Sequence, residues 1–395
     1  MKNRVVYADH SATTAVRPEV LEAMLPFFSQ QYGNASSIYQ VAQESKMALE
    51  EARKQVAKGI GAKAREIYFT GCGTEADNWA IRGAAYARRN KGKHIITSAI
   101  EHHAVLHTCE QLAKEGFDVT YLPVDEYGLV SVQSLEAAMR EDTILVTIMA
   151  ANNEIGTIEP IAELAAVAKA HGALFHTDAV QAIGSIEFNV KEMGIDMLSL
   201  SGHKFHAPKG VGALYIRSGL KIDRLIQGGA QERTQRAGTE NLASIVGMGK
   251  AIEIAAAKVK EHNEYLKTLR DHMISRILTE IPATRLNGHA EQRLPGNVNV
   301  SIRYIEGEAL LLSLDIKGIA ASSGSACTSG SLDPSHVLLA IGLPHEIAHG
   351  SLRLSLSEDN TMEEVDYAVD ALKEIVNRLR DMSPLYADAK ANGEI

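Results

Sequence analysis

The chain has 395 residues, of which 45% are hydrophobic and 23% are charged, and its formal net charge is −9. This is the composition of a globular protein, long enough for two domains or for one large domain with a smaller one. The acidic balance and the lack of a dense run of Lys and Arg argue against a nucleic-acid-binding surface.

The number of cysteines and the length of the apolar runs indicate in which cellular compartment the protein is found. Cys72, Cys109 and Cys327 are too few, and odd in number, for a disulfide framework, which favours a reducing cytoplasm. The amino terminus carries no apolar core of a signal peptide. The longest apolar run, roughly residues 144–151, has the length of a strand and not of a membrane span. We therefore expect a cytoplasmic protein that does not insert into a membrane.

Short apolar runs alternate with helix-like stretches from residue 65 to residue 178. The run 143–150 is apolar throughout, as is typical of a strand buried on both faces. Such β-α-β alternation predicts a mostly parallel sheet with helices on both faces. The predicted strands are 67–70, 94–97, 119–124, 143–150 and 173–178, and the predicted helices are 74–89, 103–114 and 161–170.

The pattern changes after residue 178. Two strand-like runs, 197–200 and 213–216, are close enough in sequence to form an antiparallel pair in a mixed sheet. Apolar residues then recur at three-, four- and seven-residue steps, which predicts one long helix over about 241–281. The remainder reads as α+β, and its tail from about residue 387 is expected to be disordered. Its predicted elements are strands 297–302, 319–321 and 352–356, helix 308–314, and a last helix that opens at the capping box Thr361/Glu364.

A lysine follows the predicted strand 197–200 in the sequence Ser201-Gly-His-Lys204-Phe-His-Ala-Pro-Lys-Gly210. At the mouth of a sheet an amine is desolvated, and a neutral amine is what a Schiff base requires. The alternative for Lys204 is an ordinary solvated surface charge.

An aspartate, Asp178, ends the predicted strand 173–178. Open α/β sheets bind ligands at the carboxyl ends of their strands, and a pyridoxal cofactor needs an acid beside its pyridinium nitrogen. Asp178 could fill that role, or it could cap a following helix.

Glycines stand between a predicted strand and helix in Gly71-Cys-Gly-Thr74. Such a turn lets the backbone approach an anion at the start of the helix, and the phosphate of a cofactor is a candidate. A plain tight turn is the alternative. We expect Cys72 to be structural.

Cys327 lies in Ser322-Ser-Gly-Ser-Ala-Cys327-Thr-Ser329, a stretch of small residues. A lone cysteine is often a core residue, but nothing bulky surrounds this one. We expect an exposed loop from which a thiolate could reach a substrate and then deliver cargo.

Together these motifs resemble the class-V aminotransferase-type cysteine desulfurases of the NifS/IscS-like group. The resemblance is carried by Lys204, Asp178 and Cys327 in their motifs and extends from Tyr7-Ala-Asp-His-Ser-Ala-Thr-Thr14 to the last helix. It implies an α/β protein with the pyridoxal-phosphate-dependent transferase fold type I, in which a mostly parallel mixed sheet is joined by a smaller α+β domain. The large cofactor-binding domain would span 15–255, and 1–14 with 256–395 would form the small domain carrying the Cys327 loop. The resemblance also implies a homodimer.

The resemblance further implies a role for each site residue. Lys204 would hold pyridoxal 5′-phosphate as a Schiff base and carry the α-proton, while His102 would stack on the ring and assist proton transfer. Cys327 would attack the sulfur of L-cysteine and pass the resulting persulfide to an acceptor such as an iron–sulfur scaffold, leaving L-alanine. The other implied contacts are Asp178 with the ring nitrogen, Gln181 with the ring hydroxyl, Gly73, Thr74, Ser201 and His203 with the phosphate, Thr239 with the phosphate in the neighbouring subunit, Asn153 with ring and substrate, and Arg353 with the substrate carboxylate.

Two positions depart from the pattern of the group, which commonly reads Gly-Asn-Pro-Ser-Ser with a histidine shortly after. Here Ala35 replaces the proline and Tyr39 follows, which leaves substrate preference open. The alternative activities are a selenocysteine lyase or a cysteine-sulfinate desulfinase, both of which need less from a loop thiol, and a simple aminotransferase, which would give Cys327 no role. The non-enzymatic alternatives are a degenerate cofactor fold and a metal-binding protein, since His103 and His107 stand at i and i+4 on a predicted helix.

Overall fold

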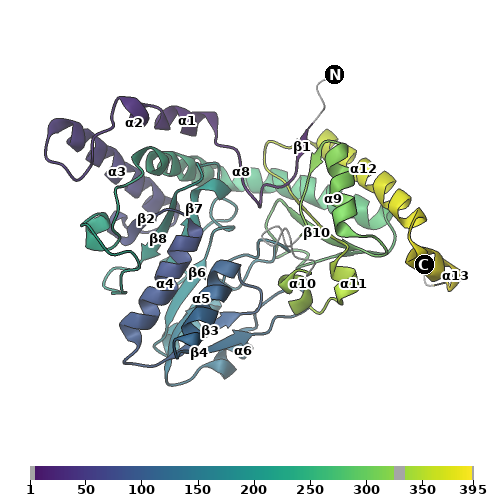
Figure 1. Cartoon of the computed structure of the whole chain (residues 1–395), viewed down its shortest axis with the longest axis horizontal. Helices are drawn as coiled ribbons and strands as arrows, with labels where there is room; N and C mark the ends of the chain where they lie inside the picture. Colours follow the sequence, from purple (N-terminus) through teal and green to yellow (C-terminus); the bar gives the residue numbers. More distant parts are fainter. Residues whose placement is uncertain (1–4, 324–333, 394–395) are drawn as a thin grey trace.

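The structure is a computed structural model that describes residues 5–323 and 334–393. Its larger part is built on a seven-stranded mixed sheet of strand order β2-β8-β7-β6-β5-β3-β4 (Figure 1). The strands from β4 to β7 run parallel, whereas β8 pairs antiparallel with β7 and with β2. The predicted parallel core and the antiparallel pair are both confirmed. The strands are β2 (Ile67–Thr70), β3 (His94–Ser98), β4 (Asp118–Leu122), β5 (Thr143–Thr147), β6 (Leu174–Asp178), β7 (Met197–Ser201) and β8 (Gly212–Ile216).

Helices cover both faces of this sheet because successive residues of a strand point to opposite sides. In β3, Ile95 packs in the core under α4 and α5, which lie in front of the sheet in Figure 1. Its neighbour Ile96 packs in the core on the other face, under α3, α7 and the first half of α8. The covering helices are α4 (Gly73–Arg88) and α5 (His103–Lys114) on one face, and α3 (Gln40–Gly59) and α7 (Ile161–Ala170) on the other.

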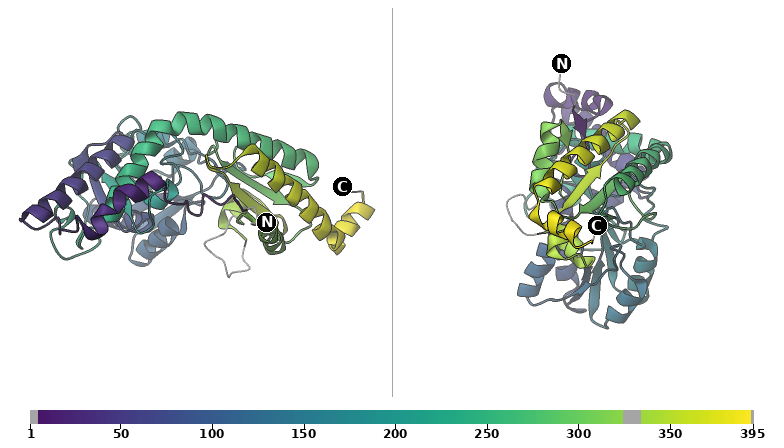
Figure 2. Two further views of the ribbon diagram at one scale, coloured as in Figure 1. Left: turned by 90° about the horizontal axis from the view of Figure 1, so that it is seen from above. Right: turned by 90° about the vertical axis from the view of Figure 1, so that its right-hand side faces the viewer.

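One helix of 39 residues, α8 (Leu242–Glu280), joins this part of the molecule to a second apolar core. Its first half contributes Ile252 to the core of the large sheet, and its second half contributes Leu269 and Met273 to the second core. Figure 2 shows the helix running along both parts. The predicted long helix is therefore confirmed.

The second core surrounds a three-stranded antiparallel sheet of order β12-β10-β9. A short parallel pair of strands, β1 with β11, brings the amino-terminal segment to the same core, where Val6 and Ala8 are buried. The predicted capping box opens α12, since the Thr361 hydroxyl accepts from the amide of Glu364 at 3.3 Å. The division into two domains at residues 15 and 255 stays a prediction. The elements are β1 (Val6–Tyr7), β9 (Thr284–Leu286), β10 (Asn297–Ile302), β11 (Ile319–Ala320), β12 (Ser351–Ser355), α9 (Gly307–Ile316) and α12 (Met362–Asp381).

The expected disorder of the tail is wrong, because α13 (Pro384–Ala391) is a helix. Proline starts this helix, and the ring of Tyr386 packs against Tyr304 and under the guanidinium of Arg380. Tyr304 is distant in the chain and Arg380 lies in the preceding helix α12, so the composition of the tail does not reveal these contacts. The remaining α-helices are α1 (Pro18–Met24), α2 (Pro26–Ser29), α6 (Val132–Ala138), α10 (His336–Ala340) and α11 (His345–Ala348). Among the residues that the structure describes, no helix is long and apolar enough to cross a membrane.

Candidate active site

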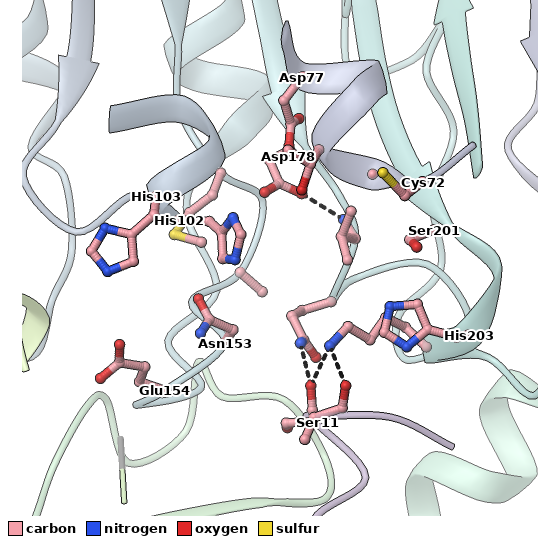
Figure 3. A pocket seen from close by; sticks show the side chains of 18 of the residues that line it. Ser11, Cys72, Asp77, His102, His103, Asn153, Glu154, Asp178, Ser201 and His203 are labelled. Atoms are coloured by element: carbon pink, nitrogen blue, oxygen red, sulfur yellow. Dashed lines mark hydrogen bonds between the residues drawn. The ribbon is translucent and has the colours of Figure 1, made fainter. Parts of the chain in front are cut away.

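A cavity of about 540 Å³ opens where the parallel strands end, between the large sheet, the amino-terminal segment and β12 (Figure 3). The predicted site residues converge there from six strands and turns. Only two of them are not placed in it: Thr239 is exposed in the loop before α8, and Cys327 lies outside the described residues. The predicted residues that line the cavity are Gly73, Thr74, His102, Asn153, Asp178, Gln181, Ser201, His203, Lys204 and Arg353.

Lys204 reaches the cavity from a single 3₁₀ turn, Gly202–Lys204, that follows β7. Its Nζ donates to the main-chain oxygens of Ser11 at 2.5 Å and Ala12 at 2.9 Å. The side-chain amide of Gln181 donates to the same Ser11 oxygen at 2.9 Å. The amino-terminal segment therefore closes one wall of the site and orients the lysine. The surface-charge alternative for Lys204 does not hold.

Asp178 ends β6 and points into the cavity, where it is only 6% exposed. Its Oδ1 accepts from the amide of Val180 at 2.9 Å, and turns rather than a helix follow it, so the alternative of a helix cap is wrong. Burial raises the pKa of Asp178, whereas the charges of His102 and Lys204 lower it. A carboxyl in this place ionises most readily opposite a cation, which suits a protonated ring nitrogen.

The turn after β2 places the first turn of α4, with Gly73 and Thr74, at the wall of the cavity. The side chain of Cys72, the residue before the helix, makes no capping hydrogen bond. A Cβ on Gly73 would lie 2.7 Å from Cγ2 of Val180, so no larger residue fits without displacing that side chain. Free N–H groups and the helix dipole favour an anion here, with Ser201 and His203 on the other side. Burial lowers the pKa of His203 to about 4, so that its ring is neutral at ordinary pH.

His102 stands at the start of α5, and its Nδ1 accepts from the amide of Ala104 at 3.1 Å. In the neutral ring the proton is therefore on Nε2. Figure 3 shows this ring directed into the cavity, between Asn153 and Asp178. A flat group held against Asp178 would meet the imidazole ring.

Arg353 enters from β12 in the second core. Its Nη1 donates to the main-chain oxygen of Asn153 and its Nη2 to Oδ1 of Asp9, both at 2.9 Å. The Nε group is buried and has no hydrogen-bond partner in the part of the chain that the structure describes. A guanidinium with an unused buried donor at a cavity suits a carboxylate ligand.

The structure adds residues that the sequence analysis missed. Cys72 was expected to be structural, but it is an exposed free thiol on the cavity wall. Glu154 also lines the cavity, where its Oε2 accepts from the Ser335 hydroxyl, and burial raises its pKa to about 7. The side chain of Asp77 lies next to Asp178. The turn Gly71-Cys-Gly gave a signal for Cys72, and Glu154 directly follows the predicted site residue Asn153. The main-chain oxygens of Ser11 and Ala12 leave no signal in the sequence, because every residue carries such an oxygen.

The histidine pair considered as a metal site lies beside the cavity. The ring of His103 stacks on His107 and also contacts His336, each with 4.9 Å between ring centroids. Within residues 5–323 and 334–393, no group of three or more His, Cys, Asp or Glu side chains is arranged to hold a metal ion.

Comparisons with known proteins bear on the chemistry of this cavity. Residues 6–368 match the family described as Aminotransferase class-V. A cysteine desulfurase IscS of Methanosarcina thermophila is 61% identical over 384 residues, which are 97% of this chain and 95% of that protein. A cysteine desulfurase IscS of Clostridium botulinum is 58% identical over 394 residues, 99% of each chain.

Solved structures agree with the sequence relatives. A structure described as a NifS-like protein superposes with a TM-score of 0.90 at 41% identity, covering 95% of this chain and 100% of that one. A NifS-like protein from Rickettsia africae superposes with a TM-score of 0.86 at 31% identity, over 95% and 100% of the two chains.

Proposed function

Since the chain belongs to the class-V aminotransferase family and is a pyridoxal-phosphate-dependent cysteine desulfurase, we propose that the cavity holds the cofactor and L-cysteine, and that Cys327 receives the sulfur. One observation carries the proposal: Lys204, the buried Asp178 and the unused Nε of Arg353 line a single cavity. The predicted role of Cys327 rests on the sequence, because this residue lies outside the described ones.

The residues of the cavity fit the cofactor. The start of α4 at Gly73 suits a phosphate, Asp178 offers a carboxylate for the ring nitrogen, and Lys204 offers the amine. We assign Thr74, Ser201 and His203 to the phosphate and Gln181 to the ring hydroxyl. When bound, the cofactor withdraws electrons from the substrate through its protonated ring.

Arg353 binds the substrate carboxylate with its Nε and orients the amino acid in the cavity. Its bond to the main-chain oxygen of Asn153 brings that residue beside the substrate. Asp9 accepts from Nη2, so the guanidinium is held from two sides before the substrate arrives. Such preorganisation lowers the entropy lost on binding.

Lys204 removes and returns a proton at Cα of the substrate, and His102 moves a second proton beside it. Cys327 then attacks as a thiolate: a bond forms between the two sulfur atoms while the carbon–sulfur bond of the substrate breaks. The carbon that loses sulfur gains a proton, and L-alanine leaves. The sulfur stays on Cys327 as a persulfide until an acceptor protein takes it.

A homodimer completes this proposal. Thr239 is exposed and outside its own cavity, which suits a contact with the cofactor phosphate of a second subunit. Its loop packs on α3, where Arg53 pairs with Glu232 at 2.7 Å. Large apolar side chains are exposed on α1 to α3 and their connections, as expected of a surface covered by another copy. They are Leu21, Leu25, Phe28, Tyr32, Ile38, Tyr39, Val41 and Met47.

We further propose an iron–sulfur scaffold as the sulfur acceptor and the cytoplasm as the location. The first is supported by the resemblance to the IscS-like group. The second is supported by the cysteines, since Cys72 and Cys109 are both free.

The test is to incubate the purified protein with L-cysteine and a reductant and to assay sulfide and alanine together. We expect equimolar sulfide and alanine from the wild type and neither from Cys327→Ala. L-selenocysteine and L-cysteine sulfinate are assayed beside cysteine. Turnover of L-cysteine that survives in Cys327→Ala would refute the role of Cys327, and a strong preference for either other substrate would favour the lyase or the desulfinase.

A further inference from the structure

A second carboxyl group, that of Asp77, lies next to Asp178 at the wall of the cavity. Asp77 projects from α4 toward the end of β6, and Figure 3 shows its carboxyl group next to that of Asp178. It is 1% exposed, and its Oδ1 has no hydrogen-bond partner among the described residues. A buried acid of this kind is costly to ionise without a counter-charge.

No counter-charge faces Asp77 in the described residues. The nearest basic group is His176, whose Nε2 lies 3.8 Å from Oδ1 of Asp77, beyond hydrogen-bonding distance. Both ring nitrogens of His176 are already engaged, Nε2 with the Ser199 hydroxyl at 2.9 Å and Nδ1 with the Thr147 hydroxyl at 2.8 Å. Burial lowers the pKa of His176 to about 3, so this ring is neutral.

The two carboxyl groups are therefore unequal. Burial raises the pKa of Asp77 well above its ordinary range, and the charges of Asp178 and Glu101 raise it further, while a hydrogen bond from the Ser199 hydroxyl lowers it by less. Asp178 accepts from the amide of Val180 and has two nearby groups, His102 and Lys204, that favour its ionised form, whereas the Ser199 hydroxyl is what favours the ionised form of Asp77. When two adjacent buried carboxyl groups share one proton, the proton stays on the group with less support.

We propose that Asp77 is a neutral carboxylic acid that holds the shared proton toward Asp178 and so leaves Asp178 as the single negative charge opposite the cofactor ring nitrogen. Asp77 is then a positioning residue: it acts through Asp178, whose charge it sets. This inference rests on the proposed role of Asp178.

The test compares three substitutions at equally buried carboxyl groups. Asp77→Asn keeps the shape and a donor but cannot ionise, Asp77→Leu removes the donor, and Glu159→Gln makes the same chemical change away from the cavity. Glu159 is 4% exposed, and its Oε2 accepts from the amide of Val130 at 2.9 Å. The readouts are the Kd of the apoprotein for pyridoxal phosphate and the pH midpoint of the visible absorbance of the bound cofactor.

We expect Asp77→Asn and Glu159→Gln to match the wild type within about threefold in Kd, because neither changes the charge or the donor next to Asp178. Asp77→Leu is expected to weaken cofactor binding by about tenfold or more, since a hydrogen bond to a charged group is lost. A large change in Kd or midpoint for Asp77→Asn would mean that Asp77 is ionised in the wild type. If Asp77→Leu binds pyridoxal phosphate with the Kd of the wild type, Asp77 only fills space. Either result overturns the proposal.

Asp178→Asn, measured in parallel, separates this inference from the one on which it rests. If Asp178→Asn binds the cofactor as the wild type does, the proposed role of Asp178 itself fails. If Asp178→Asn loses the cofactor but both Asp77 variants behave as the wild type, only the inference on Asp77 fails.

A second measurement covers the case in which Asp77→Leu does not fold. The infrared difference spectrum of wild-type apoprotein minus Asp77→Asn, taken near neutral pH, should contain the carbonyl stretch of one protonated carboxyl group. Protonated Glu101 and Glu159 occur in both proteins and cancel. A difference band of an ionised carboxylate in its place would contradict the proposal.

Discussion

Cys72 and Cys109 are free thiols that differ in their exposure. Cys72 is exposed on the cavity wall beside Gly73, whereas Cys109 is fully buried on α5. Burial raises the pKa of Cys109 to about 12, so almost none of it is thiolate at neutral pH. Since the thiolate is the reactive form, Cys72 should be the one of these two described thiols that reacts with a polar thiol reagent.

This contrast predicts a direct assay of cofactor placement. In the Cys327→Ala protein, one thiol should react quickly with an aromatic disulfide reagent, and pyridoxal phosphate should protect it because the phosphate site adjoins Cys72. The rate is followed by absorbance with and without the cofactor. The control is Cys327→Ala combined with Cys72→Ser, which should show no fast phase. An unprotected Cys72 would place the phosphate elsewhere.

Buried carboxyl groups also make the stability of the protein depend on pH. Burial raises the pKa of Glu159 to about 8 from an ordinary 4.5, and within residues 5–323 and 334–393 no cation offsets this cost. Between these two values the folded state binds more protons than the unfolded state, so stability falls as pH rises through that window. At pH values above the pKa of Glu159 in the folded state, the full free-energy cost of burying its ionised carboxylate lowers the stability.

Glu159→Gln should therefore raise the unfolding temperature at pH 8 and change it little at pH 5. The shift at pH 8 corresponds to a gain on the order of a few kcal/mol, because each unit of pKa shift is about 1.4 kcal/mol. The measurement is thermal unfolding of the wild-type and Glu159→Gln apoproteins between about pH 5 and pH 8. Equal effects at both pH values would show that the substitution acts through packing instead.

At the scale of elements, periodicity in the sequence was enough to predict most helices and strands, several to the residue. Helix α5 and helix α7 match their predicted bounds, because in each helix an apolar face packs against the sheet. The sequence also predicted which strands carry Asp178 and Lys204, since Asp178 ends one predicted strand and Lys204 follows another after a short turn. Helices, strands and the residues at their ends depend on neighbours in the sequence, so they can be predicted from it.

The parts that could not be predicted depend on distant contacts. The tail forms α13 because Tyr386 meets Tyr304 and Arg380, which are remote from it in the chain or in the preceding helix. The wall of the site at Ser11 and Ala12 acts through main-chain oxygens, which every residue carries. Asp77 is one carboxyl among many on a helix, and only the tertiary fold shows that it is buried beside Asp178.

The turn before α4 allows a test of the phosphate site at this scale. Gly73→Ala should weaken binding of pyridoxal phosphate, since its Cβ would lie 2.7 Å from Val180, but should have little effect on binding of pyridoxal, which has no phosphate. We expect a loss of about tenfold or more in the ratio of the two affinities. Gly71→Ala in the same turn is the matched control, because its Cβ would meet only the flexible end of Glu75 at 2.9 Å. A parallel loss for pyridoxal would indicate a general distortion of the turn.

At the scale of the whole molecule, the cavity belongs to both cores. The large sheet supplies Asp178 and Lys204, whereas Arg353 and the segment carrying Ser11 belong to the second core. Helix α8 packs in both cores and so holds the two sets of residues in register (Figure 2). A relative shift of the cores would separate Arg353 from Lys204, so the geometry of the site depends on this helix.

The proposed dimer adds a third contribution, Thr239 from a second chain, and mixed dimers can test it. Lys204→Ala should be inactive, and Thr239→Ala should bind the cofactor weakly and turn over slowly when pyridoxal phosphate is limiting. In a mixed dimer, the site that keeps Lys204 receives Thr239 from the other chain and is therefore intact. The purified mixed dimer should therefore have one intact site of its two and about half the activity of the wild-type dimer.

The mixture is prepared by co-expression with two different affinity tags, and the doubly tagged dimer is purified before assay. The control is a mixture of each variant with itself, which must stay at the level of the single variants. If Thr239 instead acts within its own chain, every site in the mixed dimer lacks one of the two residues and activity does not return. Recovery would thus show both that two chains associate through this face and that each active site is incomplete without the other chain.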